Sequence, residues 1–153
     1  MIVLRKNVRI RAAGIIVKDG KLLLIAHKKG SNIYWLLPGG GVQYRESLEE
    51  ALRREIYEEL HIDVAVDRPA LICDTIAPNG KRHIVNICFY CLHANGDPIL
   101  GKDKRLYDFR FFARQELNDL TIFPPIHASL DALFDMGHPT IYLGKVWADI
   151  LNV

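Results

Sequence analysis

Residues 40–62, GGVQYRESLEEALRREIYEELHI, hold six glutamates in one short run, and this stretch determines which fold we expect. Ser47 is followed three residues later by Glu50, a capping box that predicts a helix beginning at Ser47. Apolar residues then recur at every fourth position and form one stripe that can pack on a sheet: Leu48, Leu52, Ile56 and Leu60. The sequence therefore predicts an amphipathic helix here.

Three glutamates of this helix lie on one side of it. Glu55 precedes Glu58 and Glu59 by three and four residues, and side chains at these spacings are neighbours on a helix. Like charges held this way repel, and a hard divalent cation with oxygen ligands would stabilise them. The alternative is a solvated acidic helix face, which is the commoner explanation of acidic runs.

Length and composition are typical of one ordered globular domain, residues 1–153, with half of the residues apolar and a quarter charged. A net charge of +2 is too small to indicate nucleic-acid binding through bulk electrostatics. The N-terminal apolar stretches are short and interrupted by basic residues, which fits neither a signal peptide nor a membrane span. We therefore expect a cytoplasmic protein with no membrane partner. Its three cysteines favour reduced thiols.

Turn signals and apolar runs place the remaining elements. Asp19-Gly20 predicts a hairpin with strands near 9–18 and 21–28, and Asn79-Gly80 predicts a second long hairpin. After a polar loop over 95–106 we expect a strand at 107–113, a helix from about residue 128, and a short terminal helix over 142–151. This order of strands and helices indicates an α/β or α+β sandwich.

The glutamate run resembles the Nudix box. Gly40, five residues, Glu46 and seven further residues lead to Arg54-Glu55-Ile56-Tyr57-Glu58-Glu59, as in that family. The one departure from the box pattern is His61, which stands where the family has glycine. A helix end at this position often needs a left-handed backbone, which histidine tolerates better than most residues. The lead-in through Trp35, Leu37 and Pro38-Gly39-Gly40 is also similar.

The resemblance implies a Nudix-type α/β/α sandwich with a mixed central sheet, and hydrolysis of a nucleoside diphosphate linked to another moiety. It further implies that Glu55, Glu58 and Glu59 bind Mg²⁺ or Mn²⁺, with a backbone carbonyl at Gly39 or Gly40 completing the shell. Glu55 is our first choice for a second role as base. Arg54 is expected to orient the cluster, and Glu46 to pair with Arg54.

Substrate identity stays open among a nucleotide sugar such as ADP-ribose, a dinucleoside polyphosphate and a nucleoside triphosphate. Outside the box, Asp103 and Asp108 are candidate bases, Arg11 and Lys28 are candidate phosphate contacts, and Trp35 is a candidate for stacking a base. Ordinary surface charge is the favoured explanation of the basic residues, and core or rim packing is the more common role of an aromatic residue such as Trp35. The competing function is a non-catalytic regulatory module of the same fold that binds a nucleotide such as a nucleotide sugar. A homodimer is compatible with either function.

Overall fold

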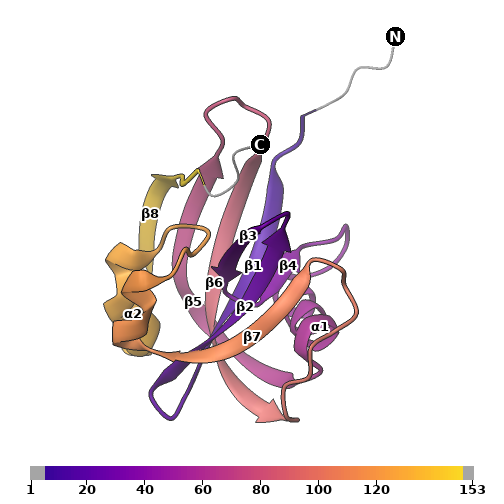
Figure 1. Cartoon of the computed structure of the whole chain (residues 1–153), viewed down its shortest axis with the longest axis vertical. Helices are drawn as coiled ribbons and strands as arrows, with labels where there is room; N and C mark the ends of the chain where they lie inside the picture. The colour runs from indigo at the N-terminus through magenta and orange to yellow at the C-terminus, as the bar shows by residue number, and fades with distance from the viewer. Residues whose placement is uncertain (1–5, 150–153) are drawn as a thin grey trace.

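The structure is a computed structural model and describes residues 6–149 (Figure 1). The elements run in the order β1 (Arg9–Lys18), β2 (Lys21–Lys29), β3 (Asn32–Leu36), β4 (Gly39–Gly41), α1 (Leu48–Leu60), β5 (Asp63–Ile76), β6 (His83–Asn95), β7 (Leu106–Ala113), η1 (Arg114–Asp119), η2 (His127–Ser129), α2 (Leu130–Phe134) and β8 (Ile141–Val146). Within the described residues, no helix is long and apolar enough to cross a membrane.

A mixed sheet forms the centre of the molecule, with strand order β3-β2-β1-β6-β5-β8. The β1–β6 and β5–β8 pairs are parallel, and the other strand pairs are antiparallel. Strand β1 pairs with β2 only near their shared turn, and its first half pairs with β4 instead. Strand β7 pairs with β2. Figure 1 shows α1 and α2 on opposite sides of these strands. The predicted α+β sandwich with a mixed sheet is confirmed.

Side chains that alternate along β1 and β2 pack into two separate hydrophobic cores. Ala13 and Ile15 belong to the core that includes α2, whereas Ala12 and Ile16 belong to the core under α1. Between them, Gly14 leaves room for the helix, because a Cβ there would lie 2.9 Å from Ile56 Cδ1. Alternate side chains of a strand point to opposite faces, so Ala12, Gly14 and Ile16 all face α1, which packs directly on β1.

Most of the expected elements are confirmed. Ser47 caps α1 through its side chain and forms both halves of the capping box with Glu50. Leu52, Ile56 and Leu60 are fully buried. The two predicted hairpins, the strand that becomes β7 and the helix after residue 128 are present.

The predicted helix over 142–151 is wrong in its described part. Ile141–Val146 form β8, which pairs in parallel with β5. Ile141 and Leu143 pack against the core while Tyr142 is exposed, an alternation suited to a strand. Gly144 adopts φ 70°, which no right-handed helix tolerates. Residues 150 and 151 lie outside the described chain.

The three cysteines are buried and unbridged, as expected for reduced thiols. Cys88 and Cys91 face opposite cores, so they cannot share a metal ion. Burial raises the pKa of Cys88 and of Cys91 to about 12, and that of Cys73 to about 11.

Candidate active site

The last two turns of α1 lie against the short strand β4. Glu59 is buried, and its Oε1 accepts a hydrogen bond of 2.7 Å from the Gly39 backbone N–H. Both Glu55 carboxylate oxygens lie beside Gly40 and would be 2.4 Å and 2.7 Å from a Cβ placed there. The Pro-Gly-Gly lead-in therefore lies directly against two carboxylates of the helix.

Glycine is required in this contact. Gly39 adopts φ 148°, and a Cβ on it would lie 2.1 Å from the Ala12 carbonyl oxygen on the paired strand β1. A Cβ on Gly40 would lie 2.3 Å from Glu55 Cδ. A larger residue at Gly39 would push β4 away from β1, whereas a larger residue at Gly40 would displace the flexible Glu55 carboxylate.

Arg54 lies on the exposed side of the same cluster and contacts several of its groups. Its guanidinium forms a two-pronged ion pair with Glu46, with hydrogen bonds of 2.6 Å and 2.9 Å. It also donates to Glu55 Oε1 at 2.9 Å, to Glu58 Oε2 at 3.4 Å and to the Gly41 carbonyl at 3.2 Å. The Arg54 hydrogen bonds lower the pKa of Glu46 to about 2.

The pKa of the buried Glu59 carboxyl shifts in the opposite direction to that of Glu46. Burial raises the pKa of Glu59 to about 8, and the Glu55 charge acts in the same direction. Arg11, Arg105 and the Gly39 N–H oppose this shift without cancelling it. A carboxyl with this pKa is one for which a nearby cation would strongly favour the ionised form.

A hard divalent cation fits these donors chemically, since all are oxygens on one helix end beside a strand of backbone carbonyls. Within residues 6–149, no three His, Cys, Asp or Glu side chains converge closely enough to hold a metal ion as they stand. Arg54 draws Glu55 and Glu58 toward itself, and Glu59 turns to Gly39. Among the described contacts each of the three carboxylates accepts hydrogen bonds through one oxygen only.

The C-terminal end of α1 is closed by the loop that precedes β7. His61 ends the helix with φ 55°, the left-handed geometry expected where the family has glycine. The backbone N–H groups of Ile99 and Gly101 donate to the carbonyls of Leu60 and Glu59, both at 2.8 Å. These contacts satisfy helix carbonyls that otherwise lack partners.

The candidate substrate residues do not gather in one place. Trp35 packs edge-on against Phe112 in the α2-side core, 4.7 Å between ring centres, which favours its packing role. Strand alternation places Lys28 and Asp108 on that same side, away from α1, where Lys28 lies over the Tyr107 ring and Asp108 pairs with Arg110. Arg11 lies on the α2 side of β1 with Ala13 and Ile15, whereas Asp103 lies in the loop that closes the end of α1.

Arg11 and Asp103 both have partners. Arg11 donates to the Leu37 carbonyl at 2.8 Å, so it fixes the entry to β4. Asp103 forms an ion pair with Arg105 at 2.8 Å, and the Arg105 hydrogen bonds lower the pKa of Asp103 to about 2. A carboxyl with this pKa is a weak base near neutral pH.

Sequence reasoning missed His27 and Arg105 at this site. The His27 ring meets Tyr34 edge-on across the β2–β3 pair, with ring centres 5.6 Å apart. Burial, together with the positive charges of Arg105 and Arg11, lowers the pKa of His27 to about 4. Leu23, Ile25 and His27 occupy alternate positions of β2 and therefore share one face of the strand. This alternation was the sequence signal that could have placed His27 on the α1 side.

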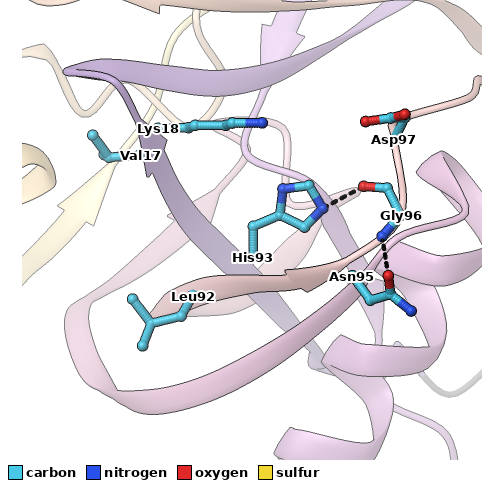
Figure 2. Close-up of a pocket in the computed structure, with 7 residues that line it drawn as sticks. All are labelled: Val17, Lys18, Leu92, His93, Asn95, Gly96 and Asp97. Atoms are coloured by element: carbon cyan, nitrogen blue, oxygen red, sulfur yellow. Dashed lines mark hydrogen bonds between the residues drawn. The ribbon is translucent and has the colours of Figure 1, made fainter.

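An open depression of about 570 Å³ lies at the other end of β1, by its turn into β2 (Figure 2). It is lined by Val17, Lys18, Leu92, His93, Asn95, Gly96 and Asp97. Figure 2 shows His93 directed toward the Gly96 carbonyl, with the Lys18 and Asp97 side chains above it. None of the α1 carboxylates lines this depression, so it is not part of the candidate site.

Comparison with known proteins gives a consistent result. The sequence model described as NUDIX domain matches residues 8–134. The chain is 30% identical over 120 residues to a protein named nucleoside triphosphatase NudI from Enterobacter sp. (strain 638), covering 71% of this chain and 84% of that protein. It is 34% identical over 100 residues to an ADP-ribose pyrophosphatase from Methanocaldococcus jannaschii, covering 63% and 57%.

Solved structures agree with this. The crystal structure of a MutT NUDIX hydrolase from Burkholderia pseudomallei is 30% identical and superposes with a TM-score of 0.65, over 84% of this chain and 97% of that one. A NUDIX hydrolase from Nitrosomonas europaea has a TM-score of 0.73 at 19% identity, over 84% and 88% of the two chains, and supports the fold alone.

Proposed function

Because the chain belongs to the Nudix hydrolase family, we propose that it hydrolyses a pyrophosphate bond in a nucleoside diphosphate linked to another moiety, using Mg²⁺ or Mn²⁺ held by Glu55, Glu58 and Glu59. The observation that carries this proposal is the contact of β4 with α1. It brings the Gly39 N–H to Glu59 and the Gly40 backbone to Glu55.

The cation would neutralise the phosphate oxygens and lower the pKa of a water at the scissile phosphorus. The protein residues hold that arrangement. Glu59 is fixed by the Gly39 N–H, and the carbonyls of Gly39 and Gly40 would supply further oxygen donors to the cation. Glu55 accepts through Oε1 from Arg54 and has a second oxygen with which to take a proton from water.

Arg54 positions this cluster by holding Glu46, Glu55 and Glu58 on one guanidinium. A bound cation would compete with Arg54 for Glu55 and Glu58, each of which also has a carboxylate oxygen without a described hydrogen bond. The ion pair with Glu46 is the shortest of the three contacts and would keep the arginine in place. A pair with two parallel hydrogen bonds has the geometry to do so.

The names of the relatives make nucleoside triphosphates and ADP-ribose the first substrates to assay. Parent protein, Glu58→Gln and the control Glu49→Gln should be compared with Mg²⁺, with Mn²⁺ and with EDTA. Glu49 is an exposed residue of the first helical turn, away from β4. We expect metal-dependent release of phosphate or nucleotide, a loss of at least about 100-fold in kcat for Glu58→Gln, and little change for Glu49→Gln.

The second candidate function is a nucleotide-binding module without turnover. The hydrogen bonds from Arg54 to Glu55 and Glu58 favour it, because they compete with metal binding. Nucleotide binding without metal-dependent turnover on either substrate or on a dinucleoside polyphosphate would establish this alternative and refute the hydrolase proposal. The single domain over 1–153, the homodimer and the cytoplasmic location stay predictions.

A further inference from the structure

A short segment crosses from the catalytic helix to strand β2. Gly101 donates its N–H to the Glu59 carbonyl, and the Arg105 carbonyl accepts from the Lys28 N–H at 3.2 Å. Five residues span at most about 18 Å when extended, so both ends of this segment lie close to the candidate site. Figure 1 shows this part of the chain passing beside α1 before β7 begins.

Asp103 fixes the Arg105 side chain within this segment. Arg105 Nη2 donates to Asp103 Oδ2 at 2.8 Å, and Nε donates to Oδ1 at 3.2 Å. The Arg105 backbone N–H also donates to Oδ1 at 2.9 Å, and a turn links Leu106 N–H to the Asp103 carbonyl. The side chain is 73% exposed, so its remaining N–H groups can meet a solvent-borne anion. A guanidinium held in this way loses little entropy when it binds phosphate.

The backbone contacts of this segment place Arg105 between the end of α1 and strand β2. Gly101 is hydrogen-bonded to Glu59, and the Arg105 carbonyl is hydrogen-bonded to Lys28, next to His27 on β2. The positive charge of Arg105 lowers the pKa values of Glu59 and His27. No ion pair joins Arg105 to Glu59 within the described residues. Because its pKa is lowered, His27 is neutral near pH 7 and adds no positive charge that would compete with Arg105 for an anion.

The basic residues that the sequence analysis singled out are engaged elsewhere. Arg11 binds the Leu37 carbonyl, Arg54 binds three carboxylates, and Lys28 lies on the far side of the sheet. The segment from Gly101 to Arg105 also carries the exposed Lys102 and Lys104, but among its described contacts the ion pair that fixes a cation is that of Arg105 with Asp103.

We propose that Arg105, oriented by Asp103, binds the phosphate group of the substrate that is not held on the α1 carboxylates. This inference rests on the proposed hydrolase function and adds a substrate-binding residue to it. A substrate with two linked phosphates would span from the carboxylate-bound cation to this guanidinium. Asp103 thereby acts as a positioning residue rather than as the catalytic base.

The chain contains a matched control. Arg110 pairs with Asp108 at the same spacing of two residues and is 65% exposed, but it lies on the opposite side of the sheet. The binding of inorganic pyrophosphate in the presence of Mg²⁺ should be measured by calorimetry for the parent, Arg105→Gln, Arg105→Lys and Arg110→Gln. We expect about a tenfold rise in Kd for Arg105→Gln, a smaller rise for Arg105→Lys, and parent-like binding for Arg110→Gln.

Steady-state kinetics should be measured on a nucleotide that the parent hydrolyses. We expect KM to rise most for Arg105→Gln, less for Arg105→Lys and not for Arg110→Gln, and kcat to change less than KM. Parent-like pyrophosphate binding by Arg105→Gln, or equal weakening in Arg105→Gln and Arg110→Gln, would overturn the role of Arg105 and leave the hydrolase proposal intact. A parent protein that binds no pyrophosphate with Mg²⁺ would also overturn the role of Arg105, whereas the hydrolase proposal is overturned by the absence of metal-dependent turnover. Melting temperatures of the variants identify any loss that reflects unfolding.

Discussion

The buried carboxyl of Glu59 should make the metal-free protein less stable as pH rises. Its pKa in the folded protein is about 8 against an ordinary value of 4.5, so the native state holds a proton that the unfolded chain releases between these values. Stability associated with this group is complete below about pH 4.5 and is lost as pH rises through 8. Replacing Glu59 by Gln removes the titration and keeps an oxygen to accept from Gly39.

The size of the effect follows from the two pKa values. Between pH 5 and pH 8 the parent should lose about 3 to 4 kcal/mol of unfolding free energy relative to Glu59→Gln. This is a large fraction of the stability of a domain of this size. Millimolar Mg²⁺ should restore much of the loss in the parent and little in the variant, because a ligand that binds only the folded state stabilises it.

Urea unfolding followed by circular dichroism, in EDTA and in Mg²⁺ at several pH values, measures these differences directly. Glu49→Gln serves as the control that removes an exposed charge from the same helix. Parallel stability curves for the parent and Glu59→Gln from pH 5 to pH 8 would refute the argument that this carboxyl is held in a desolvated position.

Three further substitutions test the site. Gly40→Ala should reduce kcat/KM at least about 100-fold, because the new Cβ displaces the Glu55 carboxylate, which steady-state kinetics would measure. The loss of stability should be modest, because the Glu55 side chain is flexible, and circular dichroism would measure it. Gly101→Ala should lower the unfolding free energy by about 2 kcal/mol in urea denaturation, because its Cβ would lie 2.0 Å from the Glu58 carbonyl oxygen, and an unchanged value would contradict the tight loop–helix contact. His27→Gln should remove an acid sensitivity of the parent: the folded pKa of about 4 lies below the ordinary 6.5, so the stability that this residue contributes is present above pH 6.5 and is lost as pH falls through 4, which unfolding at acidic pH would detect.

Local signals in the sequence were sufficient for the elements that define the candidate site. The Ser47 capping box and the leucine and isoleucine stripe determine where α1 begins and which face it buries, because both depend on residues within four positions of one another. The left-handed end at His61 was also predictable, since backbone geometry at a helix end is local.

Contacts between distant parts of the chain were not predictable. Strand β8 depends on pairing with β5, about 70 residues earlier, and nothing within Ile141–Val146 reveals that partner. The closing of the α1 end by Ile99 and Gly101, and the resulting position of Arg105, depend on a loop whose own sequence shows only polar and turn-forming residues. The glutamate motif predicts the helix, but it does not predict which loops and side chains from distant parts of the chain lie next to that helix.

The burial of all three native cysteines has a practical use. Thiols with pKa values of about 11 to 12 inside a packed core are poor nucleophiles toward maleimides and similar reagents. A cysteine introduced at Lys104, on the exposed segment between Gly101 and Arg105, would therefore be labelled selectively in the otherwise unmodified protein. A fluorophore attached there would report nucleotide arrival in real time without prior removal of any natural thiol.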